Sequence, residues 1–294
     1  MKIEAYAKIN LTLDIVGKRP DGYHDLIMIM QSVGLHDDVR VNLNDSSKIT
    51  VKSSSALLAD DESNIAYKAA KAYFEYSGMP LRGVEIQIEK NIPMEAGMAG
   101  GSADGAAVIR ALNELCGTGY SDEILWEIGV KVGADVPFCI TGGTMLSEGK
   151  GEILSSLPKM SDFRNQPVIL LCKPDIGVST GKAYAAVDSC DSERIVRPDT
   201  EGMKKALREM DTVDVAKKLS NVFEQVLNLD ECNSIKSVML ESGALGACMT
   251  GSGTTVFGIF DDAVTAKRCY FTLAKGYKNT YITCASDCGC KIVE

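Results

Sequence analysis

The first part of the chain alternates apolar and polar residues with a period of two, which is the spacing of a half-buried β-strand. The alternation runs through Lys2–Gly17, Leu26–Gly34 and Asp37–Asn44. The polar stretch KRPDGYHD separates the first two segments, and its Pro, Asp and Gly favour a tight turn. The chain is therefore expected to begin with a β-sheet.

A helical period replaces the alternation at residues 63–78, where Ser63 or Asn64 is the expected N-cap and Gly78 the terminator. The rest of this half is expected to form a strand at Gly83–Asn91 and helices at Ser102–Asn113 and Ser121–Gly133, the last capped by Ser121.

Pro and polar residues interrupt the periodicity between Leu157 and Gln166, so a domain boundary is expected there. The pattern beyond it predicts a strand at Pro167–Pro174, helices within Gly181–Gly243, a hairpin at Gly246–Phe260, a helix at Ala263–Gly276 and a strand at Asn279–Ser286. Without the additional helices this order is β-α-β-β-α-β, the ferredoxin-like arrangement. Two domains, residues 1–160 and 161–294, are expected.

The composition narrows the classes of function. Among 294 residues there are 31 basic and 40 acidic ones, and the net charge of −9 argues against binding to nucleic acid or an anionic membrane. No apolar run approaches the roughly 20 residues of a membrane helix, and Glu4, Lys8 and Asn10 interrupt any signal-peptide core. We expect a cytoplasmic protein that acts on a small molecule, as a monomer or a weak homodimer.

The ten cysteines are scattered along the chain, unlike the dense spacing of a secreted disulfide scaffold. Most are expected to be reduced and buried. Cys284, Cys288 and Cys290 could be read as metal ligands, but a fourth ligand is missing from the sequence around them.

The stretch Asn91–Leu115 places a cluster of glycines before a helix, where backbone N–H groups can hold an anion. It is not a P-loop, because Gly101 is followed by Ser102 and Ala103 and not by Lys-Ser/Thr, and its glycines do not fit the dinucleotide fingerprint. Two interpretations remain: a tight β-to-α connection, or a phosphate cradle in which Ser102 faces a metal ion. Asp104 fits either, since an acid in the first turn also stabilises the helix dipole.

Four other residues could carry chemistry. Lys8 lies on a predicted strand and either reaches solvent or faces an anion, while Asp135 lies in a predicted turn between a helix and a strand, as a positioned carboxylate or a plain turn former. Tyr23 and His24 in the KRPDGYHD turn could stack on a flat heterocycle or simply form a polar turn. The second glycine cluster, TGSGT, is by itself only a hairpin loop.

Taken together and in this order, these stretches resemble the GHMP kinase superfamily, whose signatures are a lysine strand, a glycine-serine loop before a helix and a C-terminal glycine hairpin. The resemblance runs from Ala5 to Phe260. It implies a two-domain α+β GHMP kinase fold, with an N-terminal domain of the ribosomal-protein type, a ferredoxin-like C-terminal domain and the active site in the cleft between them.

Two stretches, AYAKINLTLDIVGKRPDGYHDL and GADVPFC, are most similar to one branch of this family. That branch uses ATP to phosphorylate the C2 hydroxyl of a methylerythritol that carries a cytidine diphosphate group, in non-mevalonate isoprenoid biosynthesis. By this resemblance Asp135 is the general base, and Lys8 orients the hydroxyl and balances charge.

The resemblance also assigns binding residues. ATP binding falls to Asn64, Lys90, Pro93, Met94, Glu95, Ala96, Gly97, Met98, Ala99, Gly100, Gly101, Ser102 and Ala103, with Ser102 as a contact to Mg. Substrate binding falls to Asn10, Tyr23, His24, Thr180, Tyr184, Gly251 and Ser252, with Tyr184 on the face of the cytosine opposite the Tyr23–His24 pair. The loop departs from the family pattern at Met98, where leucine is usual, and at Ala99, where glycine is usual.

Three alternatives remain at this stage. A sibling kinase acting on mevalonate, homoserine or a sugar would not need Tyr23, His24 and Tyr184. A catalytically silent nucleotide-binding regulator would be expected to lack Lys8 or Asp135. A zinc or redox protein would use the C-terminal cysteines.

Overall fold

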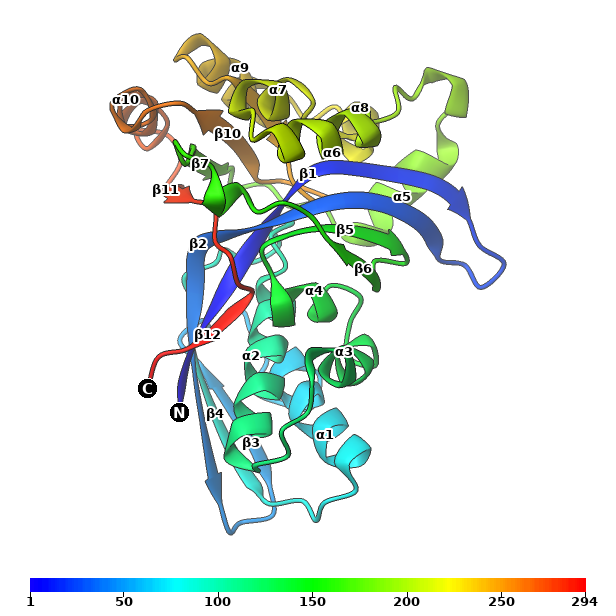
Figure 1. Cartoon of the computed structure of the whole chain (residues 1–294), viewed down its shortest axis with the longest axis vertical. Coiled ribbons are helices and arrows are strands. Elements are labelled where there is room, and N and C mark those ends of the chain that lie inside the picture. Colours follow the sequence, from blue (N-terminus) through cyan, green and yellow to red (C-terminus); the bar gives the residue numbers. More distant parts are fainter.

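The computed structural model describes residues 1–294, apart from the side chain of Ser192. Two β-sheets organise the chain, and helices cover them (Figure 1). The larger sheet has the order β12-β1-β2-β4-β3, with β5, β6 and β8 attached to it. Its strands are β1 (Lys2–Lys18), β2 (His24–Asn44), β3 (Ile49–Ser53), β4 (Gly83–Glu89), β5 (Thr144–Gly149), β6 (Ile153–Ser156), β8 (Ser220–Asn221) and β12 (Cys290–Ile292).

The expected strands at Leu26–Gly34 and Asp37–Asn44 are in fact one strand, β2, so the predicted break between them is wrong. The strand continues because β1 pairs with it across the expected gap, with Tyr6 opposite His36. The short strands β3, β5 and β6 were not predicted. They have five, six and four residues.

Four helices lie on one side of the larger sheet: α1 (Ile65–Ser77), α2 (Gly100–Leu115), α3 (Asp122–Val130) and α4 (Val136–Thr141). Asn64 is the N-cap of α1, because its side chain accepts from the Ala66 N–H, and Gly78 ends the helix with a left-handed φ of 64°. The predicted start of α2 at Ser102 is two residues late. Ser121 precedes α3 but makes no side-chain cap, and α3 ends three residues before the predicted Gly133.

The second sheet confirms the ferredoxin-like prediction. Its strands are β7 (Val168–Lys173), β9 (Gly246–Met249), β10 (Val256–Phe260) and β11 (Asn279–Cys284), and they are antiparallel in the order β11-β7-β10-β9. Helices α9 (Asp230–Glu241) and α10 (Ala263–Leu273) pack on it. The remaining helical elements are α5 (Thr180–Ser189), α6 (Thr200–Glu209), α7 (Thr212–Lys217), α8 (Val222–Leu227) and 3-10 turns at Met160–Asp162 and Ser192–Arg194.

The two halves of the chain are packed into each other. Ile9 of β1 belongs to the same buried cluster as Leu171 of β7 and Phe257 of β10, so the two sheets share apolar contacts. The second half also supplies β8 and β12, which pair with β1 on the larger sheet. Both termini therefore lie side by side (Figure 1). No helix in the described part of the chain is long and apolar enough to cross a membrane.

Candidate active site

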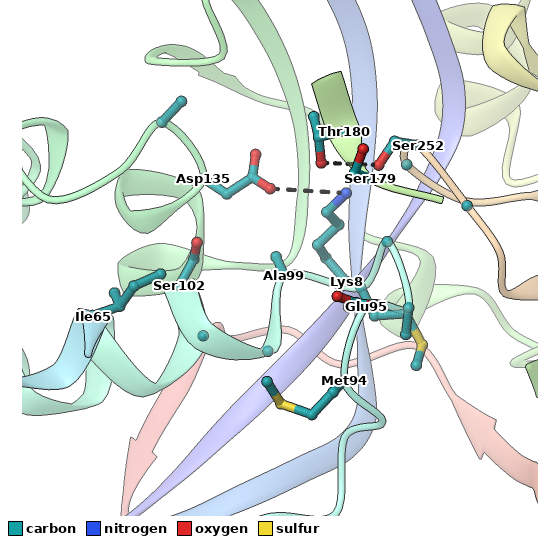
Figure 2. Close-up of a pocket in the computed structure, with 18 of the residues that line it drawn as sticks. Lys8, Ile65, Met94, Glu95, Ala99, Ser102, Asp135, Ser179, Thr180 and Ser252 are labelled. Atoms are coloured by element: carbon teal, nitrogen blue, oxygen red, sulfur yellow. Dashed lines mark hydrogen bonds and ion pairs between the residues drawn. The ribbon is translucent and has the colours of Figure 1, made fainter. Parts of the chain in front are cut away.

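A cavity of about 670 Å³ lies where the glycine loop, β1, α4 and the second half of the chain meet (Figure 2). Most of the residues expected to bind ATP or substrate line it: Lys8, Asn64, Lys90, Pro93, Met94, Glu95, Ala96, Gly97, Met98, Ala99, Gly100, Gly101, Ser102, Asp135, Thr180, Tyr184, Gly251 and Ser252. Ala103 is instead buried in the core, and Asn10, Tyr23 and His24 are not among the lining residues.

Two irregularities in β1 turn polar side chains toward this cavity. The pairing of β1 with β2 shifts register between Tyr6 and Lys8 and again between Asn10 and Thr12. A one-residue slip moves side chains to the opposite face of a sheet. Between the two shifts the apolar Ile9 faces the second sheet, and Lys8 and Asn10 face the helices.

Lys8 and Asp135 face each other across the cavity, as Figure 2 shows. Lys8 is buried, and its Nζ donates to Asn10 Oδ1 at 2.8 Å and lies 4.0 Å from Asp135 Oδ2. A separation at the outer limit of an ion pair leaves room for a hydroxyl that donates to the carboxylate and accepts from the ammonium.

The expected location of Asp135 needs correction. It does not lie between a helix and a strand, because Asp135 is the N-cap residue of the six-residue helix α4. Its side chain makes no cap hydrogen bond and is 33% exposed, so both carboxylate oxygens are available to a ligand.

The glycine loop lies against the hairpin loop of the second half, backbone to backbone. A Cβ at Gly97 would lie under 3.0 Å from Thr250 O, and one at Gly251 under 3.0 Å from Gly97 O, closer than real Cβ atoms approach. Both residues have positive φ, 70° and 56°. Glycine is required at these positions by the close contact of the two loops as well as by the backbone conformation.

Ala99 also has a left-handed backbone, with φ 57° and ψ 30°, directly before helix α2. This conformation gives a physical reason for the family preference for glycine at this position, since alanine there is strained by about 1–2 kcal/mol. The first N–H groups of α2, at Gly100, Gly101 and Ser102, have no intrahelical acceptor, and all three residues line the cavity.

Lys90 is part of a buried ion cluster beneath the loop. Its Nζ donates to Asp104 Oδ2 at 2.7 Å and to Asp37, whose second oxygen accepts from the N–H groups of Asn91 and Ile92. Burial lowers the pKa of Lys90. The nearby side chains of Asp104 and Asp37 raise it by more than burial lowers it, so the net shift is upward. Burial raises the pKa of Asp104 to about 8, opposed by Lys90 and assisted by Asp37. The ammonium of Lys90 is thus already engaged by the side chains of Asp37 and Asp104.

Asn10 and Asn221 hold the second glycine loop, and nothing in the sequence drew attention to Asn221. Asn10 Oδ1 accepts from Gly251 N at 2.9 Å and from Thr250 Oγ1 at 3.2 Å. Asn221 Nδ2 donates to Met249 O at 2.7 Å and to Gly251 O at 2.9 Å. Asn221 ends β8, so only the long-range pairing of β8 with β1 brings it here.

Two of the three residues expected around a cytosine, His24 and Tyr184, contact each other directly. The ring of His24 stacks on Tyr184, with centroids 4.6 Å apart and an interplanar angle of 20°, and Phe223 meets the Tyr184 ring edge-on at 5.0 Å. His24 Nε2 lies 2.7 Å from Asp188 Oδ1. A base can enter between His24 and Tyr184 only if the centroids move to about 7 Å apart.

Tyr23 lies outside this stack. Its side chain is 61% exposed, and the Nζ of Lys150 lies 4.7 Å from the centroid of its ring. Lys150 lines the cavity and brings positive charge to its edge. Neither Lys150 nor Phe223 had been expected from the sequence, because each lies outside the stretches that carried the resemblance.

The described residues contain no group of three or more His, Cys, Asp or Glu side chains arranged to hold a metal ion. The three C-terminal cysteines differ in exposure, since Cys284 is exposed, Cys288 is partly buried and Cys290 is buried. Thr180 Oγ1 lies 3.3 Å from Ser252 Oγ at the cavity edge (Figure 2).

A glycine loop at a helix N-terminus, opposed by a buried lysine and an exposed carboxylate, defines the site of a small-molecule phosphotransferase. Comparison with known proteins agrees. The model of the GHMP kinases N terminal domain matches residues 64–143 and that of the GHMP kinases C terminal matches residues 202–279, together more than half of the chain. The chain belongs to the GHMP kinase family.

Particular relatives are similar over nearly the whole chain. The 4-diphosphocytidyl-2-C-methyl-D-erythritol kinase of Clostridium tetani is 43% identical, covering 96% of this chain and 99% of that protein. The protein of the same name from Clostridium perfringens is 45% identical, covering 96% and 97%. A crystal structure of 4-(cytidine 5'-diphospho)-2C-methyl-D-erythritol kinase superposes with a TM-score of 0.79 at 28% identity, over 97% of this chain and 99% of the other. The homoserine kinase of Cytophaga hutchinsonii, with a TM-score of 0.80 at 20% identity, shares the fold.

Proposed function

We propose that this chain transfers the γ-phosphoryl group of ATP to the C2 hydroxyl of 4-diphosphocytidyl-2-C-methyl-D-erythritol, a step of non-mevalonate isoprenoid biosynthesis. The Lys8–Asp135 pair, which faces the glycine loop across one cavity, is the observation that carries the proposal. The relatives at 43–45% identity bear the name of this activity.

The glycine loop is well suited to the phosphates of ATP. The N–H groups of Gly100, Gly101 and Ser102 are free at the start of α2, where the helix dipole adds partial positive charge. Ser102 adds a hydroxyl oxygen, a ligand type that Mg²⁺ accepts when most of its shell is water and phosphate. Bound MgATP would supply the transferred group and a cation that neutralises its oxygens. The nucleotide end of the cavity would be lined by Asn64, Lys90 and Pro93 to Ala96. Lys90 would act indirectly, through Asp104 and the loop, because its ammonium already binds Asp37 and Asp104.

Asp135 acts as the general base in this proposal. Its free carboxylate accepts the proton of the attacking hydroxyl, while Lys8 Nζ orients the hydroxyl oxygen and offsets charge that develops on the phosphoryl group. A positioned base contributes roughly 10²–10⁴-fold to the rate. Asn10 holds Lys8 in place through the 2.8 Å bond.

The cytidine end of the substrate is assigned to His24, Tyr184 and Tyr23. Separation of the His24 and Tyr184 rings would open a slot for the base, in which one polar edge of His24 remains fixed by Asp188. Thr180, Gly251 and Ser252 line the same cavity as Tyr184 and Asp135. Lys150 places an ammonium beside Tyr23, where it can attract the diphosphate.

The principal rival is a sibling kinase acting on mevalonate, homoserine or a sugar. The shared fold of homoserine kinase does not separate the two, whereas the aromatic cluster around Tyr184 favours a substrate with a flat ring. The decisive experiment measures ATP consumption with the cytidyl substrate, mevalonate, homoserine and galactose. We expect turnover with the first alone, and loss of turnover in Asp135→Asn and Lys8→Ala with ATP binding retained. Activity with another alcohol only, or full activity in either variant, would overturn the proposal.

A further inference from the structure

We propose that the C-terminal segment Ser286–Ile292, here called the C-terminal clamp, positions Asp135 by holding the far end of helix α4. The inference rests on the proposed role of Asp135 as the base. It adds that this role requires the last residues of the chain, which lie outside every motif that carried the functional assignment.

Helix α4 has only six residues, so its last carbonyl groups cannot find partners within the helix. The clamp supplies them. Thr141 O accepts from Gly289 N at 2.9 Å, and Ile140 O accepts from Cys290 Sγ at 3.5 Å. Arg110 of helix α2 adds a second donor to Ile140 O at 2.9 Å. Without the clamp, Thr141 O would lose the N–H of Gly289, and Ile140 O would keep the guanidinium of Arg110 but lose the thiol.

Contact between the clamp and α4 is direct, backbone against backbone. A Cβ on Gly142 would lie under 3.0 Å from Gly289 N, and a Cβ on Gly289 under 3.0 Å from Cys139 O. Gly142 also has a positive φ of 71°, whereas Gly289 does not have a left-handed backbone. Any side chain at Gly289 must therefore displace α4, and it does so without introducing backbone strain of its own.

The other side of the clamp is bound to the strand that carries Lys8. Gly289 O accepts from Tyr6 N at 2.9 Å, and Cys290 pairs with Ala5 in the β12–β1 ladder. Gly289 thus joins two elements of the site. Its carbonyl binds β1 at Tyr6, two residues before Lys8, and its N–H binds the last turn of α4, the helix that begins directly after Asp135. This connection fixes the base relative to the lysine that faces it at 4.0 Å.

The remaining supports of α4 keep the helix in place when the clamp is disturbed. Thr141 Oγ1 donates to Asp122 Oδ2 at 3.0 Å and accepts from Trp126 Nε1 at 3.0 Å. A side chain at Gly289 should consequently shift α4 without unfolding it. Because misplacement of a reacting group by about 1 Å can cost 10²-fold in rate, the effect should fall on kcat.

The test compares Gly289→Ala with the matched control Gly276→Ala, at a position where the nearest atom to a new Cβ, Leu273 O, is 4.0 Å away. Both variants are assayed with saturating ATP and cytidyl substrate, well below their melting temperatures, and ATP affinity is measured by calorimetry. We expect kcat of Gly289→Ala to fall about 10–100-fold with ATP affinity unchanged, and the control to match the wild type. A purely structural role would lower the melting temperature and leave kcat of the folded enzyme unchanged, which would overturn the inference.

If Gly289→Ala does not fold, Cys290→Ala takes its place, since it removes the Sγ donor to Ile140 O and one thiol from the core while leaving the backbone of the clamp unchanged. Its kcat should fall severalfold at unchanged ATP affinity, and a wild-type kcat would contradict the clamp. The two proposals fail in different ways. An inactive wild-type enzyme contradicts the proposed function, whereas an active wild type with an equally active clamp variant contradicts only the present inference.

Discussion

Replacement of Asn10 by alanine should separate the catalytic geometry from general stability. Asn10 is completely buried, and its Oδ1 accepts from three donors: Lys8 Nζ at 2.8 Å, Gly251 N at 2.9 Å and Thr250 Oγ1 at 3.2 Å. Alanine removes this oxygen, so the ammonium of Lys8 and the N–H of Gly251 lose the acceptor that they share. One substitution thus releases Lys8 from its nearest partner and removes the side-chain acceptor for the glycine hairpin, while the backbone N–H of residue 10 can still donate to Thr250 Oγ1.

The size of the effect follows from these bonds. A hydrogen bond to a charged group contributes about 1.5–3 kcal/mol, and an unpaired buried donor costs about 1–3 kcal/mol. The free energy of unfolding of Asn10→Ala should therefore fall by about 3–5 kcal/mol, which lowers the melting temperature by roughly 5–8 °C in a protein of this size. Since Lys8 loses its orientation, kcat should fall by about 10²-fold in the folded enzyme.

The matched control is Asn113→Ala. Asn113 is also buried, and its Oδ1 accepts from Thr118 Oγ1 at 2.7 Å and Tyr120 N at 2.9 Å, near the end of α2 remote from the loop. The melting temperature of Asn113→Ala should fall by an amount similar to that of Asn10→Ala, and its kcat should equal that of the wild type. Calorimetry gives the first quantity and a coupled ATP-consumption assay the second. Equal kcat values for the two variants would refute the assignment of Asn10 to the positioning of Lys8.

Three further outcomes are expected. Ala99→Gly relieves about 1–2 kcal/mol of left-handed strain against about 0.5–1 kcal/mol of backbone entropy, so the melting temperature should rise by up to about 2 °C. A fall in the melting temperature would contradict the strain. Burial first, and then Asp37, raises the pKa of Asp104 to about 8 against the effect of Lys90, so the folded state holds a proton that the unfolded state has lost. The free energy of unfolding should decline between about pH 4 and pH 8 by at most about 1.4 kcal/mol per pH unit. Urea titrations at several pH values should show that the free energy of unfolding of Asp104→Asn changes less with pH than that of the wild type. His24→Ala should raise KM for the cytidyl substrate about 10-fold or more, since stacking on a base contributes about 1–3 kcal/mol, and should leave KM for ATP unchanged.

The controls for these variants lie in the same chain. His36→Ala alters the only other histidine, which packs on Tyr6 away from the cavity, and both KM values should stay at the wild-type level. Equal increases in both KM values for His24→Ala would count against a role in reading the base. An unchanged pH slope in Asp104→Asn would show that Asp104 is ionised throughout.

Local rules explain why much of the fold was predictable. A period of two identified β1 and β4, and the apolar segment Pro167–Pro174 identified β7 as a buried strand. The cap at Asn64 and the terminator at Gly78 fixed α1, because both act through neighbouring backbone groups. The ferredoxin-like order followed from the succession of elements alone. The gap predicted within β2 shows the limit, since pairing with β1 extends the strand through residues that carry no alternation of their own.

Other parts of the site depend on contacts between distant segments. The register shifts that turn Lys8 and Asn10 toward the cavity arise from pairing with β2, and alternation along one strand cannot reveal them. Helix α4 is too short to show a helical period, so Asp135 was expected before a strand. Asn221 and the clamp reach the site only through β8 and β12, whose pairing with β1 spans most of the chain.

The two ends of the cavity differ in how far they are formed before a ligand binds. Gly97 and Gly251 lie so close that neither tolerates a Cβ, and Lys8 N donates to Met98 O at 3.1 Å, so the phosphate loop is already fixed against both β1 and the hairpin. At the other end, His24 and Tyr184 occupy the space that a base would need. On the proposed function, binding of the nucleotide phosphates therefore requires little rearrangement, whereas binding of a cytosine must first break a stacking contact of about 0.5–1.5 kcal/mol. On the proposed function, this cost falls on the substrate alone and not on ATP. A ligand with a flat ring regains stacking contacts on both His24 and Tyr184 once it is bound, whereas mevalonate and homoserine have no ring and gain nothing from this pair.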